Sequence, residues 1–138
     1  MSPSLHQSLL MVSDLEASVA FYRDLVGVAP VERNDGNVEF DTGECTLVLE
    51  SDFDQEVLDG FGLDEPGDER GRGVIVAIGV DDPEAVDTVC ERAAEADETV
   101  RMDPTDVEWG RRMALLADPD DYTVEISAPL KEDQRSNT

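Results

Sequence analysis

The sequence carries one short motif twice, and this repeat limits the possible folds of the chain more than any other feature. Residues 12–17 (Val-Ser-Asp-Leu-Glu-Ala) recur as residues 80–85 (Val-Asp-Asp-Pro-Glu-Ala), an offset of 68 residues in a chain of 138. An apolar run of the kind found in β-strands accompanies each copy, at 8–12 and at 74–80. Because the offset is about half the chain length, the sequence predicts two copies of one structural module.

A helix is predicted directly after each copy of the motif. Ser13 or Asp14 can cap the first helix, and Asp82 can cap the second, with Pro83 at its first helical position. Apolar residues follow at helical spacing in both segments, which gives each helix one face to bury. Gly27 is the expected end of the first helix, because glycine adopts the left-handed conformation that closes many helices.

Three short runs of β-strand character follow each helix, separated by turn residues. They cover residues 29–33, 38–41 and 46–50 in the first half, and residues 98–102, 113–117 and 122–127 in the second. Both halves therefore have the order β-α-β-β-β. We predict an α+β fold in which two βαβββ modules form a cupped, mixed β-sheet with the helices on its outer face.

The predicted modules have clear limits in the sequence. Module one spans residues 5–50 and module two spans 74–128, within a single domain of residues 1–138. An acidic, glycine-containing segment, 51–73, connects them, and we expect it to be a loop. The polar tail, 129–138, closes the chain and is expected to be disordered towards its end.

The charge of the chain restricts its partners. Thirty-four acidic residues stand against ten basic ones, for a net charge of −24. Disorder would explain such a charge, but 40% of the residues are hydrophobic and fall in periodic segments. The better explanation is a halophilic, acidic protein from a high-salt cytoplasm, where salt screens the repulsion between carboxylates. Nucleic acid and anionic membranes would be repelled, so we expect neither as a partner.

The two cysteines and the N-terminus agree with a cytoplasmic protein. Cys45 and Cys90 are far apart and have no metal-binding or redox spacing, so we expect free thiols in a reducing compartment. The sequence has no signal-peptide pattern at its start and no apolar segment of membrane-spanning length.

Alternation along the last strand predicts which side chains face a ligand. Val124 and Ile126 share the face expected under the helix, while Thr123, Glu125 and Ser127 share the opposite face. A face with small residues and one carboxylate is typical of a partly open cavity. We therefore expect a small-molecule site on this side of the sheet.

Three motifs carry a resemblance to a known family. Residues 12–24, ending at Gly27, are similar to the first strand and helix of the glyoxalase/bleomycin-resistance/extradiol-dioxygenase (vicinal oxygen chelate) superfamily. Residues 118–125 (Asp-Pro-Asp-Asp-Tyr-Thr-Val-Glu) resemble its terminal hairpin, with Asp121 where glycine is usual, and residues 109–112 (Trp-Gly-Arg-Arg) resemble a sub-family pattern. The resemblance covers residues 5–128 and implies the same two-module fold.

The resemblance also implies positions for a divalent metal, which these enzymes use to stabilise a substrate oxyanion. The matching positions are Gln7 in the first strand, Glu50 or Val48 in the fourth, Ile75 where a histidine is common, and Glu125 in the last strand. Isoleucine cannot coordinate a metal. Gln7, Glu50 and Glu125 would form an all-oxygen set, which suits a loosely held cation better than zinc. The expected cofactor is therefore either none or a divalent metal.

Further candidates lie beside the expected cavity. Trp109 can stack on a flat ligand, and Arg112, or its neighbour Arg111, can pair with an anion. Ile75 would line the same cavity. His6 is the only histidine and lies one residue from the ligand position, so its side chain is expected on the other face. Extradiol dioxygenase chemistry, which needs two histidines, is excluded.

Three functions stay open at this point. The first is a metal-free small-molecule-binding protein of the bleomycin-resistance type, using Gln7, Glu50, Ile75, Trp109, Arg112 and Glu125. The second is a metal-dependent lyase or isomerase of the glyoxalase type, with Glu125 as ligand or base. The third is a non-catalytic scaffold or regulatory dimer. The resemblance implies a homodimer, with its modules either paired within one chain or swapped between chains.

Overall fold

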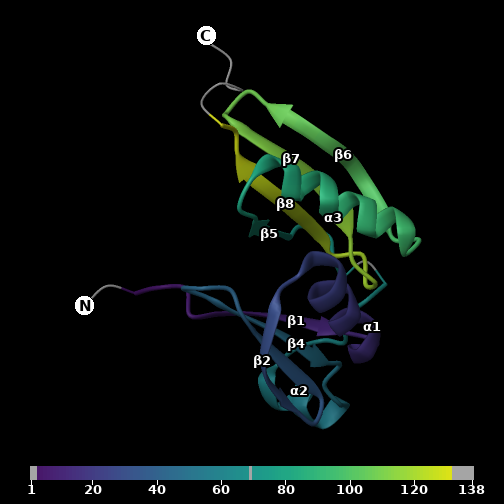
Figure 1. Ribbon diagram of the computed structural model, residues 1–138. Helices are drawn as coiled ribbons and strands as arrows, with labels where there is room; N and C mark the ends of the chain where they lie inside the picture. The colour runs from purple at the N-terminus through teal and green to yellow at the C-terminus, as the bar shows by residue number, and fades with distance from the viewer. Residues whose placement is uncertain (1–2, 69, 132–138) are drawn as a thin grey trace. The chain divides into compact units, whose positions relative to one another are not determined.

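The computed structural model describes residues 3–68 and 70–131, and the chain divides into two compact units, one ending at Arg70 and the other beginning at Gly71 (Figure 1). The expected disorder of the last residues falls on 132–138, outside the described residues. Among the described residues, no helix combines the length and apolarity needed to cross a membrane.

The first unit is one βαβββ module followed by a short helix. Its elements are β1 (Gln7–Val12), α1 (Leu15–Ala20), η1 (Phe21–Val26), β2 (Ala29–Asn34), β3 (Asn37–Asp41), β4 (Thr46–Ser51) and α2 (Gln55–Phe61). The four strands form one sheet in the order β1-β4-β3-β2, with β1 parallel to β4 and the other pairs antiparallel.

The second unit repeats this topology. Its elements are β5 (Ile75–Gly79), α3 (Pro83–Glu95), β6 (Thr99–Val107), β7 (Arg111–Ala117) and β8 (Thr123–Pro129). The sheet order is β5-β8-β7-β6, with β5 parallel to β8, and α3 packs against β6, β7 and β8 (Figure 1). The predicted α+β class with two βαβββ modules is confirmed.

The helix starts follow from the expected caps. The Asp14 side chain accepts a hydrogen bond from the backbone N–H of Ala17 at 3.1 Å, so Asp14, of the two candidates, caps α1. Asp82 caps α3 in the same way. The first helix continues as the wider π-helical turn η1 and ends at Gly27, whose φ of 96° is readily available only to glycine.

The connector contains one element that the sequence did not indicate. Asp54 caps α2, Gly62 ends it with φ of 73°, and Leu58 is its buried residue. Gly60 lies inside this helix and weakens its propensity, which is why the segment looked like a loop. The predicted strands also lengthen: β6 continues beyond residue 102 to Val107, and β7 begins at Arg111 instead of Met113.

Each unit has its own core between helix and sheet. Val19 and Tyr22 from the helical segment pack with Phe40 and Leu49 of the first sheet, all at most 2% exposed. In the second unit, the buried residues are Val86, Val89 and Ala93 of α3 and Ala114, Leu116, Val124 and Ile126 of the sheet. The alternation predicted for the last strand is therefore correct, since Val124 and Ile126 lie on the α3 side.

Candidate functional site

Glu125 lies on the face of the second sheet that points away from α3, which we call the distal face. The register pairs Glu125 with Ala77 of β5 and with Leu115 of β7, so Glu125 lies between a small and a larger apolar residue. Ile75 shares this face, pairs with Thr123 and is 60% exposed. The distal face around Glu125 therefore combines one carboxylate with apolar side chains.

A chain of hydrogen bonds holds the Glu125 carboxylate. The Ser127 hydroxyl donates to Glu125 Oε2 at 3.2 Å, and Arg111 donates to Ser127 Oγ from Nε at 3.2 Å and from Nη2 at 3.1 Å. Ser127 is only 3% exposed, while Glu125 and Arg111 are half-buried. Because Ser127 uses its one proton on Glu125, the hydroxyl accepts from Arg111, and the order Arg111–Ser127–Glu125 is fixed.

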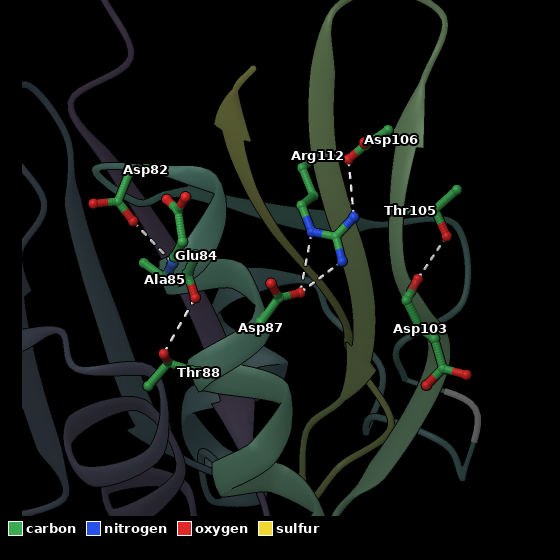
Figure 2. A network of polar contacts seen from close by, with 9 residues as sticks. All are labelled: Asp82, Glu84, Ala85, Asp87, Thr88, Asp103, Thr105, Asp106 and Arg112. Atoms are coloured by element: carbon green, nitrogen blue, oxygen red, sulfur yellow. Dashed lines mark hydrogen bonds and ion pairs between the residues drawn. The ribbon is translucent and has the colours of Figure 1, made fainter. Parts of the chain in front are cut away.

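Arg112 lies on the opposite side of the sheet from Arg111. Its guanidinium donates to Asp87 Oδ1 of α3 from Nε at 3.0 Å and from Nη2 at 2.8 Å, and to Asp106 Oδ1 from Nη1 at 2.9 Å (Figure 2). The hydrogen bonds with Asp87, and then those with Asp106, raise the pKa of the Arg112 guanidinium. Arg112 thus joins α3 to the sheet, and Arg111 is the arginine beside Glu125.

Trp109 occupies the turn between β6 and β7. It is 65% exposed, and the turn closes through a hydrogen bond from the Gly110 N–H to the Val107 carbonyl at 3.0 Å. Gly110 has φ of 86°, which explains the glycine after the tryptophan. Trp109 is therefore held two residues before Arg111 with its indole accessible to solvent.

The first sheet places Gln7 and Glu50 apart. Gln7 pairs with Thr46, whereas Glu50 pairs with Met11, four residues farther along the parallel strands. At a rise of roughly 3.3 Å per residue, their Cα atoms differ by about 13 Å along the strand direction. Glu50 instead accepts a hydrogen bond from Asn37 Nδ2 at 3.4 Å, while Gln7 is exposed.

The sequence match extends over both units. A family model described as the Glyoxalase/Bleomycin resistance protein/Dioxygenase superfamily matches residues 4–126. The chain belongs to this superfamily. The resemblance of the three motifs is thereby confirmed.

Curated and solved members of the glyoxalase superfamily are similar to this chain over nearly its whole length. A probable lactoylglutathione lyase of Vibrio cholerae is 28% identical over 125 residues, covering 86% of each chain. A glyoxalase/bleomycin resistance protein/dioxygenase from Nocardioides is 26% identical with a TM-score of 0.72, covering 100% of this chain and 91% of that one. A family enzyme from Burkholderia phytofirmans, 24% identical, covers 93% and 100% with a TM-score of 0.77 and shows the shared fold.

The metal that the glyoxalase superfamily implies can be tested against the register. In the second unit, Ile75 pairs with Thr123, and Glu125 lies two residues beyond that partner. In the first unit, Gln7 pairs with Thr46, so the residue equivalent to Glu125 is Val48. The register thus identifies Val48, and not Glu50, as the equivalent position, and Val48 is 3% exposed and has no donor atom.

The donor set does not fit a catalytic metal. Of the four equivalent positions, Val48 and Ile75 are hydrocarbon, which leaves only Gln7 and Glu125 with oxygen donors. Three protein ligands are usual for a catalytic metal. Across residues 3–68 and 70–131, no group of three or more His, Cys, Asp or Glu side chains is arranged to hold a metal ion.

The sequence left two features of this region open. Val48 and Glu50 share one face of β4, and only the pairing with β1 separates them. The sequence also leaves open which of Arg111 and Arg112 faces the ligand. Alternation along the strand distinguishes the two arginines. Arg111 lies on the same face of β7 as Met113 and Leu115, which pair with Ser127 and Glu125.

Proposed function

We propose that this superfamily member is a small-molecule-binding protein of the bleomycin-resistance type, which holds its ligand on the distal face of the second sheet without a metal. The observation that carries the proposal is the register of the two parallel strand pairs. By this register, Val48 and Ile75 stand at two of the four positions that the resemblance implies for metal ligands. A hydrocarbon side chain at half of the positions removes the chelation on which metal-dependent members rely.

The distal face has the composition of a ligand-binding surface. Met113, Leu115 and Ile75 supply apolar area, and the Arg111–Ser127–Glu125 chain supplies a small set of oriented polar groups. Most small-molecule sites combine these two elements, since burial provides affinity and a few fixed hydrogen bonds provide orientation.

The equivalent face of the first sheet differs in character. Where the second sheet has Met113, Leu115 and Ala117, the first has Asn37, Glu39 and Asp41. Carboxylates at these places favour hydration over contact with an apolar ligand. The difference supports the second sheet as the ligand-binding one.

A metal-dependent lyase or isomerase of the glyoxalase type is the second candidate. The Vibrio cholerae relative is called a probable lactoylglutathione lyase, and it covers most of this chain. In this alternative, Glu125 would act as a metal ligand or as a base. The homodimer, the cytoplasmic location and the adaptation to salt stay predictions.

Metal analysis separates the two candidates. The purified protein would be incubated in molar KCl with zinc, nickel, manganese or iron(II), desalted and analysed for bound metal. We expect well below one metal per chain, equal in the wild type, in Glu125→Gln and in the matched variant Glu50→Gln. One tightly bound metal per chain that is lost only in Glu125→Gln would overturn the proposal and favour the lyase.

A ligand screen tests the binding function itself. We expect at least one class of small molecule to raise the melting temperature of the wild type in molar KCl, since a ligand that binds only the folded state stabilises it. A broad library of neutral, cationic and anionic compounds that gives no stabilisation at all would refute a binding role for the distal face.

A further inference from the structure

Arg111 differs in its partners from the ion-paired basic residues of this acidic chain. Its two hydrogen bonds both go to the Ser127 hydroxyl, and within residues 3–68 and 70–131 no carboxylate lies in ion-pair contact with it. Ion pairs with Asp or Glu occupy other basic residues, namely Arg23, Arg33, Arg70, Arg101, Arg112 and Lys131. A half-buried guanidinium that makes no direct ion pair is a suitable receptor for an anion.

The hydrogen bonds to Ser127 leave some N–H groups of the Arg111 guanidinium unused. Ser127 takes the Nε proton and one Nη2 proton, so Nη1 and the second Nη2 proton are available. Two parallel N–H groups on one side of a guanidinium match the geometry of a carboxylate or phosphate group. Because Ser127 is buried and also bound to Glu125, it restrains the guanidinium in one orientation.

The same serine sets the spacing between the two charged groups of the site. Arg111 Nη2 and Glu125 Oε2 lie 3.1 Å and 3.2 Å from Ser127 Oγ, so they are at most about 6 Å apart. A ligand whose anionic group binds Arg111 can therefore place a neighbouring hydroxyl or ammonium group at Glu125. The paired Met113 and Leu115 would contact an apolar portion of the same molecule.

We propose that the ligand is a small amphipathic organic acid: a carboxylate or phosphate binds Arg111, an adjacent hydrogen-bond donor binds Glu125, and an apolar group lies on Met113 and Leu115. This inference rests on the proposed binding function and gives it a ligand class. The net charge of −24 repels an anion at long range. In about 1 M salt the Debye length falls to roughly 3 Å, so the local contacts with Arg111 determine the binding.

Calorimetric titration in 1 M KCl tests the ligand class, with the fluorescence of Trp109, the single tryptophan, as a second readout. Mandelate supplies a carboxylate, a neighbouring hydroxyl and a phenyl ring, and phenyl phosphate supplies the phosphate arm. The neutral control is 1-phenylethane-1,2-diol, in which a hydroxymethyl group replaces the carboxylate. We expect mandelate or phenyl phosphate to bind at least tenfold more tightly than the diol.

Matched variants then assign the binding to Arg111. Arg111→Gln is expected to weaken binding at least tenfold. Arg111→Lys keeps the charge but loses the paired N–H groups of the guanidinium, so its affinity should lie between those of Arg111→Gln and the wild type. Arg92→Gln, at an exposed position of α3, removes the same charge away from the distal face and should bind as the wild type does.

Two results would overturn the inference. One is equal affinity of the organic acids for wild type and Arg111→Gln. The other is binding of neutral or cationic compounds with no response to either acid, which would leave the binding function in place while removing the anion from it. A complete absence of ligands in the broader screen would instead refute the binding function.

Discussion

Gly71 lies beneath the hairpin that leads into β8, and its replacement by alanine is expected to destabilise the second unit. Gly71 is buried, and a Cβ atom there would overlap the backbone carbonyl of Asp121 and lie 2.6 Å from the Cα of Tyr122. The hairpin has little freedom to move away, because the Asp118 side chain accepts hydrogen bonds from the N–H groups of Asp120 and Tyr122, both at 2.9 Å.

The size of the effect follows from this rigidity. Forcing one extra methyl group into a packed site costs about 1–3 kcal/mol, and a clash with backbone falls in the upper part of that range. We therefore expect Gly71→Ala to lower the free energy of unfolding by about 2–3 kcal/mol. For a chain of this size, the corresponding fall in melting temperature is about 10 °C.

The assay is thermal and urea unfolding in molar KCl, with Gly60→Ala as the matched control. Gly60 lies inside α2, has no atom near its would-be Cβ, and has an ordinary backbone conformation. Alanine there should stabilise by about 0.5–1 kcal/mol, because it favours the helix. If Gly71→Ala unfolds within 0.5 kcal/mol or so of the wild type, the packing of residue 71 against the hairpin is refuted.

Two other predictions concern thiol chemistry and salt. Burial, with the charges of Asp103 and then Asp87, raises the pKa of Cys90 to about 11. At pH 8 a thiol reagent should therefore modify Cys45 first, and Cys90 only after addition of urea. Equal rates of modification in the folded protein would contradict this prediction. Since an unfolded thiol ionises near pH 8.5, Cys90 should also make the fold less stable as pH rises towards about 11. Melting temperature should rise steeply with KCl from low to molar concentration, and a flat profile would refute the adaptation to salt.

Local signals in the sequence predicted much of this fold. Asp14, Asp82 and Gly27 act within one helical turn, so their roles could be recognised without knowledge of the tertiary structure. The alternation of Val124 and Ile126 is equally local. The repeat of the capping motif then predicted the same order of elements in both units.

The candidate site depended on pairing between distant strands, which local signals do not contain. Val48 and Glu50 lie on the same face of β4, and only the register of β4 on β1 determines which of them matches Glu125. Arg111 and Arg112 lie at the start of a strand whose first residue the sequence placed at Met113. Neighbouring residues of a strand point to opposite faces of the sheet. The sequence alone therefore did not show which of the two arginines faces the proposed anion site and which one binds α3.

The two units share a topology but have diverged at the positions that decide function. Glu125 of the second sheet corresponds to Val48 of the first, and Ser127 corresponds to Glu50. The first sheet thus has a carboxylate two residues farther along the strand, held by Asn37 instead of by a serine bound to an arginine. Both units keep an aspartate cap at the start of their first helix, while the outward-facing positions of their sheets differ. A ligand that needs both a cation and an apolar surface can use only the second of these faces.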